Sequence, residues 1–570
     1  MASETDRPRP FIGALAGLLA GAVAVGVGQF VASLGAQNSS PVIAVGSSAI
    51  GLAPPAVKNF AISAFGSDDK IALLTGIYVL LGIYAAVVGV LGNRRLNYGL
   101  TGIAAFAAVG LAAAATRPGA NAGYVIPTLI AAAASAITLI LLLRNIPARP
   151  QPASTTEKTT SPKPTPPAGK KPSQPASKKP AQPAGQKPAP PGGDWWKPGA
   201  SSPPRPSATR PVYPDQQRRA FLITGTAAAA TAVAGGVAAR VFAERGAVTH
   251  ARADLRFPAP KLLLADRLPS GSDLQIPGLS SFITPNSSFY RVDTAIVLPQ
   301  VPPENWTLRI HGMVEREIEI SFDQLLHRPL IETYVTLCCV SNPVAGPYVG
   351  NARWLGASLA DLIREARPRA GADQILSTST DGYTSGTPVQ TVLDGRDALL
   401  AVAMNGQPLP VEHGFPARMV VPGLYGYVSA TKWVTDLKLT TFRAESSYWS
   451  QRGWLQQAPV KTESRIDVPN GTGPVKAGQT PVAGVAWAQH RGIEAVHVQV
   501  DNGPWQEATL ATVPGLDTWR QWVWYWDASP GNHLIQARAT DKTGYTQTRV
   551  QEPPEPNGAS GYPQVQVTVQ

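Results

Sequence analysis

Long apolar segments separated by short polar ones dominate the first quarter of the chain. Each approaches the roughly 20 residues that a helix needs to cross about 30 Å of hydrocarbon. They cover about residues 11–34, 71–91, 98–116 and 124–143. Arginines such as Arg94, Arg95 and Arg144 gather at alternate connections, and basic residues favour the cytoplasmic side. We therefore expect an α-helical transmembrane region of four helices over residues 1–145, with both ends cytoplasmic; buried helices of a soluble protein are the weaker alternative.

A proline-rich segment follows the apolar region. Between Asn145 and Asp215 the sequence contains 20 prolines, eight lysines, three arginines and three acidic residues, a local charge of 8 + 3 − 3 = +8. Such a composition cannot bury enough apolar area to offset chain entropy, so residues 146–217 are predicted to be a disordered cytoplasmic linker. The segment also accounts for most of the net charge of +12, so the basic balance does not indicate nucleic-acid binding.

Residues 218–245 begin with paired arginines. Arg218 and Arg219 precede Phe221-Leu222 and a weakly apolar run, rich in Ala and Gly, that ends near Ala239. This pattern resembles a twin-arginine export signal inside the chain, and an ordinary fifth transmembrane helix is the alternative. Both interpretations predict a multi-pass protein of the plasma membrane whose remaining residues are extracytoplasmic. Twin-arginine export moves folded domains, which suits a domain that receives a cofactor in the cytoplasm.

The remaining chain divides into two predicted domains. Residues 257–458 alternate short β-rich runs with helical ones, which is typical of an α+β domain. Residues 461–570 contain only strand signals at the spacing of a β-sandwich. We expect five tryptophans of this second domain to pack in its core: Trp505, Trp519, Trp522, Trp524 and Trp526.

The candidate chemistry begins at Cys338-Cys339, the only two cysteines, which follow a run typical of a buried strand. Two cysteines exclude a disulfide scaffold and a cysteine-ligated iron–sulfur cluster. A buried cysteine often acts as a small hydrophobe, and adjacent cysteines form a disulfide only with backbone strain. One thiolate is too few ligands for zinc, but it suits a soft metal that brings its own sulfur ligands.

A second candidate stretch covers residues 404–423 and 429–433. His413, Arg418 and Lys432 could converge with backbone N–H groups on a phosphate, because arginine binds it bidentately and lysine acts as a point charge. A structural histidine and solvated charges are the alternative. All seven histidines follow residue 249, so the four-helix region has no histidine pair to ligate haem.

These stretches resemble the sulfite oxidase family of molybdopterin enzymes. Thr336–Cys339 is similar to the family's strand that ends in the molybdenum-ligating cysteine, and the 405–423 stretch is similar to its pterin-binding segment. Further similar segments are Thr284–Arg291, Asp381–Tyr383 with Pro388, Gly484–Trp487, and Val500–Gly503 with Trp505. The resemblance covers about residues 257–570 and says nothing about residues 1–240. It implies that residues 461–570 form an immunoglobulin-like domain of the dimerisation type.

The resemblance also implies a cofactor and its ligands. Cys339 would bind the molybdenum of Mo-molybdopterin, which carries one pterin dithiolene, and Cys338 would only neighbour it. The implied cofactor-binding residues are Ser287, Tyr290, Arg291, Cys339, Ser379, His413, Arg418, Ser429, Thr431 and Lys432. The implied catalytic residues are Cys339, Arg291 and Trp454. No haem is expected.

Two departures from the family pattern bear on the substrate. The sulfite-binding arginines that follow the cysteine in the family are replaced by Asn342-Pro343-Val344, and Trp454 stands where a catalytic tyrosine is expected. We therefore expect a membrane-anchored extracytoplasmic oxidoreductase that transfers an oxygen atom on a small substrate, such as an S-oxide or N-oxide, rather than a sulfite oxidase. Its expected partners are a separate electron donor or acceptor protein, or a quinone-linked partner, and a second copy in a homodimer. The alternative is a non-catalytic cofactor-binding module of a membrane complex.

Overall fold

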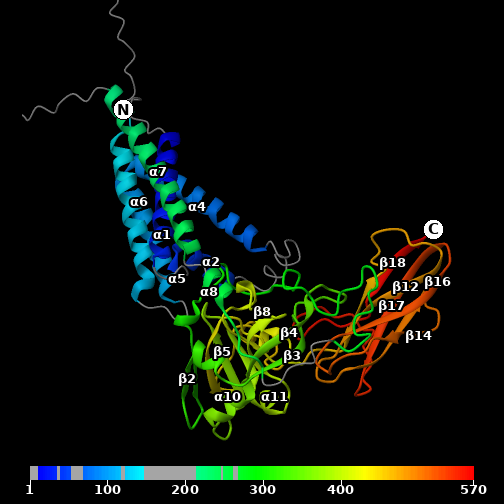
Figure 1. Ribbon diagram of the computed structural model, residues 1–570. Helices are drawn as coiled ribbons and strands as arrows, with labels where there is room; N and C mark the ends of the chain where they lie inside the picture. Colours follow the sequence, from blue (N-terminus) through cyan, green and yellow to red (C-terminus); the bar gives the residue numbers. More distant parts are fainter. Residues whose placement is uncertain are drawn as a thin grey trace, which may run out of the picture.

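The computed structural model describes residues 10–34, 39–52, 69–116, 122–146, 214–245, 248–260 and 268–570. The linker predicted over residues 146–217 lies almost wholly outside the described residues. A bundle of long helices stands at one end of the molecule, and two sheet-rich regions make up the rest (Figure 1).

The helical bundle contains five helices that are long and apolar enough to span a membrane, among the residues described. They are α1 (Pro10–Ser33), α4 (Asp69–Arg94), α5 (Leu96–Ala115), α6 (Ile126–Arg144) and α7 (Pro214–Arg245). α1 packs against α4, α6 and α7, and small residues bring the backbones close together. A Cβ added to Gly17 of α1 would lie 2.8 Å from Cα of Gly89 in α4. Close backbone packing of this kind holds apolar helices together in lipid, where the hydrophobic effect does not drive their association.

The helix directions place the basic residues at one end of the bundle. α4, α5 and α6 are successively antiparallel, since Gly92 lies near Gly99 and Gly110 lies near Thr128. α1 is antiparallel to α4, whereas α1 and α7 run in the same direction and meet where Gly26 lies against Ala232. The end that carries Arg94, Arg95 and Arg144 is therefore opposite the end at which α7 leads into the sheet-rich regions (Figure 1).

Two short helices join the bundle to the sheets. α2 (Pro41–Leu52) falls in a stretch that the hydrophobic pattern had marked only as a connection; its 12 residues are apolar but too few to cross a membrane. A Cβ added to Gly46 of α2 would lie 3.2 Å from Cδ1 of Ile296 in the sheet-rich region. α8 (Thr249–Asp254) is fastened by Arg252, whose guanidinium donates hydrogen bonds to the carbonyl oxygens of Leu409 (2.7 Å) and Pro408 (2.9 Å).

The first sheet-rich region contains two five-stranded sheets, described in the order of their strands. One has the order β2 (Ile318–Ser321), β1 (Thr307–Gly312), β10 (Val434–Thr440), β5 (Gln374–Ser379), β6 (Thr384–Pro388). The other has the order β3 (Leu330–Cys338), β4 (Val349–Ser358), β7 (Leu399–Met404), β8 (Gln407–Pro408), and β9 (Arg418–Val420) pairs with β7. The helices between the strands are α9 (Phe322–Leu326), α10 (Leu359–Ala366) and α11 (Val389–Leu393). The mixture of sheets and short helices agrees with the predicted α+β character.

The C-terminal region consists of two four-stranded antiparallel sheets. One has the order β11 (Glu463–Val468), β12 (Gly478–Trp487), β16 (Arg520–Ala528), β15 (Thr509–Leu510). The other has the order β14 (Gln506–Glu507), β13 (Ile493–Val500), β17 (Gly531–Asp541), β18 (Gln564–Val569). Alternate residues of both sheets fill one shared core, in which Trp522 and Trp526 are the largest side chains.

Trp505 departs from its expected place in that core. Its ring is only partly buried and stacks near the surface, with the Arg538 guanidinium 4.3 Å from its centre and Tyr562 against its edge. Trp505 follows the turn at Asp501–Gly503 and precedes a two-residue strand, so its side chain reaches an edge of the sheet instead of the interior. Trp519 is buried, but it packs in the core of the neighbouring region.

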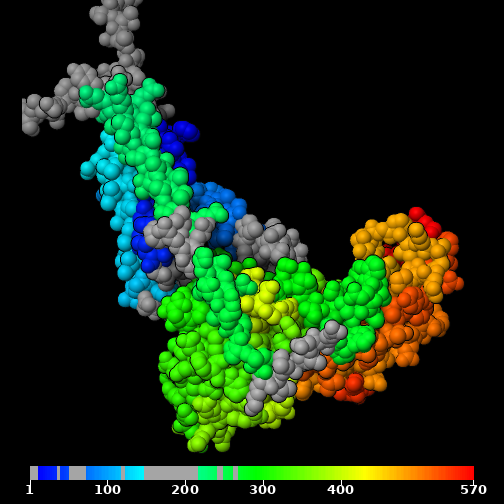
Figure 2. Space-filling view, viewed as in Figure 1, coloured from blue at the N-terminus to red at the C-terminus, as the bar shows by residue number. Residues whose placement is uncertain are grey.

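The C-terminal region contacts the edge of β3, the strand that carries the cysteines. Thr336 donates its backbone N–H to the Asp517 carbonyl (2.9 Å), its hydroxyl accepts the Trp519 N–H (2.7 Å), and its carbonyl accepts the Gln489 side-chain amide (2.9 Å). In Figure 2 the C-terminal region, in orange and red, lies against one side of the green sheet-rich region. β3 is therefore held between β4 on one side and the C-terminal region on the other.

Candidate cofactor site around Cys339

The two cysteines lie where β3 leaves its sheet. Cys338 is the last residue of the strand and Cys339 the first of the following turn, where its N–H donates to the Tyr348 carbonyl (2.9 Å) and its carbonyl accepts the Asn342 N–H (3.1 Å). Both are buried free thiols, so they are not joined in a disulfide. Since neighbouring side chains at a strand end point to opposite sides, the two sulfurs have different surroundings.

Hydrogen-bond donors and one cation act on the Cys339 sulfur. The backbone N–H and the hydroxyl of Ser341 both donate toward it. Burial raises the pKa of the Cys339 thiol, while the Ser341 donors and the nearby Lys432 charge lower it. Such donors and charges favour a sulfur that carries negative charge, as a metal-bound thiolate does.

The Cys338 sulfur faces a small cavity between the two sheet-rich regions. Glu463, Tyr425 and Trp487 are among its lining residues. Burial, followed by the charges of Cys339 and Glu463, raises the pKa of the Cys338 thiol well above its ordinary value. Cys338 is buried and its raised pKa keeps it neutral, with only the Arg465 charge opposing that shift, so it is the less suitable metal ligand of the two.

The pterin-like stretch begins with a tight turn between β7 and β8. Asn405 (φ 53°) and Gly406 (φ 76°) both have positive φ, which is the requirement of a two-residue hairpin and the reason for an Asn-Gly pair there. The Asn405 side-chain amide donates to the Thr284 carbonyl (2.9 Å) and to Asn286 Oδ1 (2.8 Å). The turn thus fixes the 284–291 segment beside the strand ends.

His413 is buried against that same segment. Its Nε2 lies 3.2 Å from the Asn286 carbonyl oxygen, and its ring meets the edge of Phe289 at 5.5 Å. Burial, together with the neighbouring Arg418 charge, lowers the pKa of His413 to about 4. The imidazole is therefore neutral at pH 7 and its Nε2–H donates to the carbonyl.

Arg418 is a buried cation without a carboxylate partner among the described residues. Its guanidinium donates to the carbonyl oxygens of His413 (3.1 Å), Ala430 (3.3 Å) and Met419 (3.4 Å), and it lies 5.1 Å from the Trp354 ring centre. Burial lowers the pKa of Arg418 to about 10, so it stays charged at neutral pH. A buried charge held only by carbonyls is costly, and a bound anion would offset that cost.

Lys432 forms a second buried cationic group with Asp293 and Arg291. Lys432 Nζ lies 2.7 Å from Asp293 Oδ2 and donates to the Glu412 carbonyl (3.0 Å), and Arg291 Nε lies 2.9 Å from the same Asp293 oxygen. Burial lowers the pKa of Lys432 to about 8, although Asp293 opposes the shift. Two cations share one carboxylate, so the group keeps a positive charge.

Gly414 allows these side chains to approach one another. Its φ is +111°, and a Cβ there would lie 3.0 Å from Cβ of Arg418 and 3.1 Å from Cα of Lys432. Any larger residue would be strained and would push the His413 turn away from both cations.

The other predicted residues have different surroundings. The Ser429 hydroxyl donates to backbone carbonyls within its own turn, and the Thr431 hydroxyl pairs with Ser377 (2.7 Å). Ser379 Oγ is buried and has no hydrogen-bond partner within the described chain. Ser287 is exposed. Trp454 packs on Tyr427 (5.8 Å) and Trp449 (6.1 Å), and no interaction between described residues joins it to Cys339.

Three residues near the site were given no role from the sequence, although Tyr383 belongs to the Asp381–Tyr383 segment that resembles the family. Ser341 contacts the Cys339 sulfur, Asp293 joins the two cations, and the pKa of Tyr383 is raised by burial and then by the Cys339 charge. Ser341 and Asp293 each lie two residues beyond a predicted residue, which was the available signal. Together these groups fit a soft metal that is carried by an anionic organic cofactor. The Cys339 thiol would bind the metal, and the three cations (Arg291, Arg418 and Lys432) and the unpartnered Ser379 hydroxyl could bind the anionic part of the cofactor.

Comparisons with known proteins found a family model, similar sequences and a similar solved structure. Residues 295–449 match the model of the oxidoreductase molybdopterin binding domain. The chain is 30% identical over 291 residues to mitochondrial sulfite oxidase of Rattus norvegicus, covering 43% of this chain and 52% of that one. It is 30% identical over 149 residues to the uncharacterized oxidoreductase YuiH of Bacillus subtilis, covering 26% of this chain and 72% of that one. The solved sulfane dehydrogenase SoxCD from Paracoccus pantotrophus is similar with a TM-score of 0.45 and 21% identity, covering 56% of this chain and 92% of that one.

The matched sequences define a molybdopterin-binding oxidoreductase. The chain belongs to the sulfite oxidase family, as its cysteine and pterin motifs predicted, and the family members it matches indicate an enzyme. It spans about half the length of the sulfite oxidase from rat that it matches.

Proposed function

We propose that this chain is a membrane-anchored enzyme that uses Mo-molybdopterin for oxygen-atom transfer. Its substrate would be small and uncharged, and the reaction would be, for example, the reduction of an S-oxide or an N-oxide. The observation that carries the proposal is the environment of Cys339. Its sulfur receives two donors from Ser341 and senses the charge of Lys432, while Cys338 faces the opposite side.

The chain's own groups would hold the cofactor. Cys339 would supply the protein ligand to molybdenum, and Arg418 and Lys432 would bind the phosphate of the pterin. Neutral His413 would lie beside the pterin and form hydrogen bonds with it. When bound, the metal would supply two-electron oxygen-atom exchange between its +4 and +6 states. The protein would provide orientation and electrostatics, as is usual for cofactor enzymes. Ser341 would keep the sulfur oriented.

The side chains that sense the Cys339 charge support an uncharged substrate. Besides Lys432, they include three tyrosines, Tyr290, Tyr383 and Tyr425, whose pKa values are raised mainly by burial and further by this charge. Lys432 already has Asp293 as its counter-ion. Because the proposal assigns Arg418 and the remaining charge of the Lys432 group to the pterin phosphate, no further cation is left for a dianion such as sulfite, whereas phenol hydroxyls can donate to a neutral oxide.

The turn after the cysteine argues the same way. The family's sulfite-binding arginines are replaced there by Asn342-Pro343-Val344, and the Asn342 side chain accepts the Tyr348 N–H (2.7 Å), which closes the turn on itself.

The bundle suggests where the enzyme acts. Arg94, Arg95 and Arg144 lie at the end away from the sheets, so the positive-inside rule favours an extracytoplasmic catalytic region. We further propose export through Arg218-Arg219 as a twin-arginine signal, electron exchange with a separate partner, and homodimerisation through an immunoglobulin-like C-terminal region. Replacing both arginines with lysine should stop a C-terminal tag from becoming accessible to protease in spheroplasts; an unchanged accessibility would favour an ordinary fifth helix.

The central experiment measures cofactor and turnover in the purified full chain. We expect about one molybdenum and one pterin per chain, and reduction of dimethyl sulfoxide, methionine sulfoxide or trimethylamine N-oxide with reduced methyl viologen. Sulfite oxidation with ferricyanide should be far slower. If sulfite is the best substrate, the substrate proposal is wrong. If the loaded protein turns over none of them, the non-catalytic cofactor-binding module becomes the better description.

A further inference from the structure

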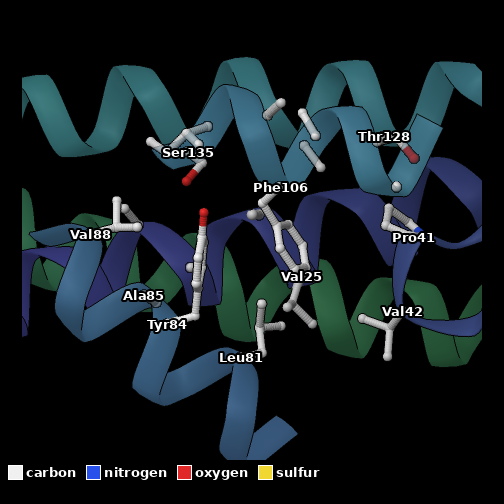
Figure 3. A pocket seen from close by; sticks show the side chains of 18 of the residues that line it. Val25, Pro41, Val42, Leu81, Tyr84, Ala85, Val88, Phe106, Thr128 and Ser135 are labelled. Carbon is white, nitrogen blue, oxygen red and sulfur yellow. The ribbon is translucent and has the colours of Figure 1, made fainter. Parts of the chain in front are cut away.

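The helical bundle contains an apolar pocket of about 100 Å³ that is far from the candidate cofactor site in sequence. Residues of α1, α2, α4, α5 and α6 line it, and nearly all of its surface is carbon. Figure 3 shows the rings of Tyr84 and Phe106 projecting into it, and their centroids are 5.5 Å apart. The pocket therefore presents flat aromatic walls as well as aliphatic ones.

One polar group in the pocket lacks a partner. Thr128 on α6 is 4% exposed, and its Oγ1 has no hydrogen-bond partner within the described part of the chain. The residue facing it on α5 is Gly110, where a Cβ would lie 3.0 Å from Cγ2 of Thr128. By contrast, the Tyr84 hydroxyl already donates to the Gly102 carbonyl (2.8 Å). A buried hydroxyl left unpaired costs free energy that an acceptor on a ligand would recover.

One end of the pocket, formed with α2 and Thr128, lies toward the sheet-rich region that holds the candidate cofactor site. Its wall includes Pro41 and Val42 of α2, the helix whose Gly46 lies against Ile296. Ile296 follows Asp293, the counter-ion of Lys432, by three residues. α2 therefore connects the wall of the pocket to the segment that carries Asp293.

We propose that this pocket binds the ring of a lipid-soluble quinone, with a ring carbonyl accepting a hydrogen bond from the Thr128 hydroxyl. A lipid acyl chain would fill the same apolar volume but has no acceptor for that hydroxyl and no ring to lie against Tyr84 and Phe106. The proposal rests on the proposed function, because it supplies that enzyme with a redox partner.

The electron balance of such a pairing is complete. A hydroquinone that becomes a quinone releases two electrons and two protons. Reduction of an S-oxide to a sulfide consumes two electrons and two protons, breaks the sulfur–oxygen bond and forms one water molecule. One hydroquinone is therefore oxidised for each S-oxide reduced.

Direct binding to the full chain tests the proposal. The chain is placed in phosphatidylcholine nanodiscs, and bound decylubiquinone is quantified by equilibrium partition, beside decylbenzene, which has a ring and tail but no carbonyl. We expect saturable decylubiquinone binding at least tenfold tighter than that of decylbenzene. Thr128→Val should weaken decylubiquinone binding at least tenfold, and Thr128→Ser, which keeps the hydroxyl, should restore it.

The matched control is Thr138→Val on the same helix. The Thr138 hydroxyl donates to the Ala134 carbonyl within its helix (2.8 Å) and does not line the pocket, so this change should leave binding unaltered. Equal binding of the two probes, with no effect of Thr128→Val, would overturn the proposal in favour of a hydrocarbon chain, and so would a lack of saturable binding. Because partition requires no turnover, its failure is distinct from an absence of molybdenum or of viologen-driven activity.

Discussion

Cys338 and Cys339 are neighbours in the chain, yet the Cys339 sulfur receives donors from Ser341 while the Cys338 sulfur lines a cavity with Glu463. We expect Cys339→Ser to lose molybdenum and all turnover, because the cofactor loses its only protein thiolate. Cys338→Ser should retain most of both. Molybdenum content by mass spectrometry decides the matter, and the reverse result would move the ligand to Cys338.

The role of Lys432 in cofactor binding can be tested by comparison with Lys438, a lysine that is also paired with a carboxylate but is more exposed. Lys432→Gln should lower pterin retention after gel filtration at least tenfold, since it removes a buried cation 2.7 Å from Asp293. Lys438→Gln removes a lysine whose pair with Glu445 is partly exposed and worth little, so retention should not change. Equal retention by both variants would exclude Lys432 from the phosphate site.

The packing of α1 on α4 predicts an asymmetry between two glycines. Gly17→Ala should destabilise the bundle by about 1–3 kcal/mol, because the added methyl meets the backbone of α4. Gly76→Ala should be neutral or slightly stabilising, because no atom lies within 4 Å of its added Cβ. Thermal unfolding in detergent measures both, and equal melting temperatures would show that α1 and α4 do not pack this closely.

The Glu463 carboxyl predicts a pH dependence of stability. Burial raises its pKa from the ordinary 4.5 to about 8, so the folded chain holds a proton that the unfolded chain releases between these values. The free energy of unfolding should therefore fall as pH rises from about 5 to 8, by at most about 1.4 kcal/mol per pH unit. Denaturant unfolding followed by tryptophan fluorescence measures the slope. Glu463→Gln should flatten it, and Glu552→Gln at an exposed position should not.

Much of the fold was predictable because it depends on local patterns. The four apolar runs, the strand before Cys338 and the helix at Leu359–Ala366 follow from length and periodicity. α2 was missed because 12 apolar residues are too few to stand out, and Trp505 was misplaced because alternation does not show which strands are edges.

Site residues could be predicted from the sequence only where they belong to a recognisable motif. The motifs named Cys339, His413 and Arg418, whereas Asp293 and Tyr383 act through contacts between segments distant in sequence. The closeness of His413, Arg418 and Lys432 depends on the positive φ of Gly414, a backbone geometry that residue spacing does not specify.

The hydrogen bonds that join Thr336 to Asp517, Trp519 and Gln489 have a consequence for biogenesis. The outer edge of the cysteine strand is completed by residues that are synthesised long after the strand itself. A nascent chain that stops short of Trp519 would present an unfinished β3, so maturation of the cysteine site has to wait until these later residues have been synthesised and have folded against the strand.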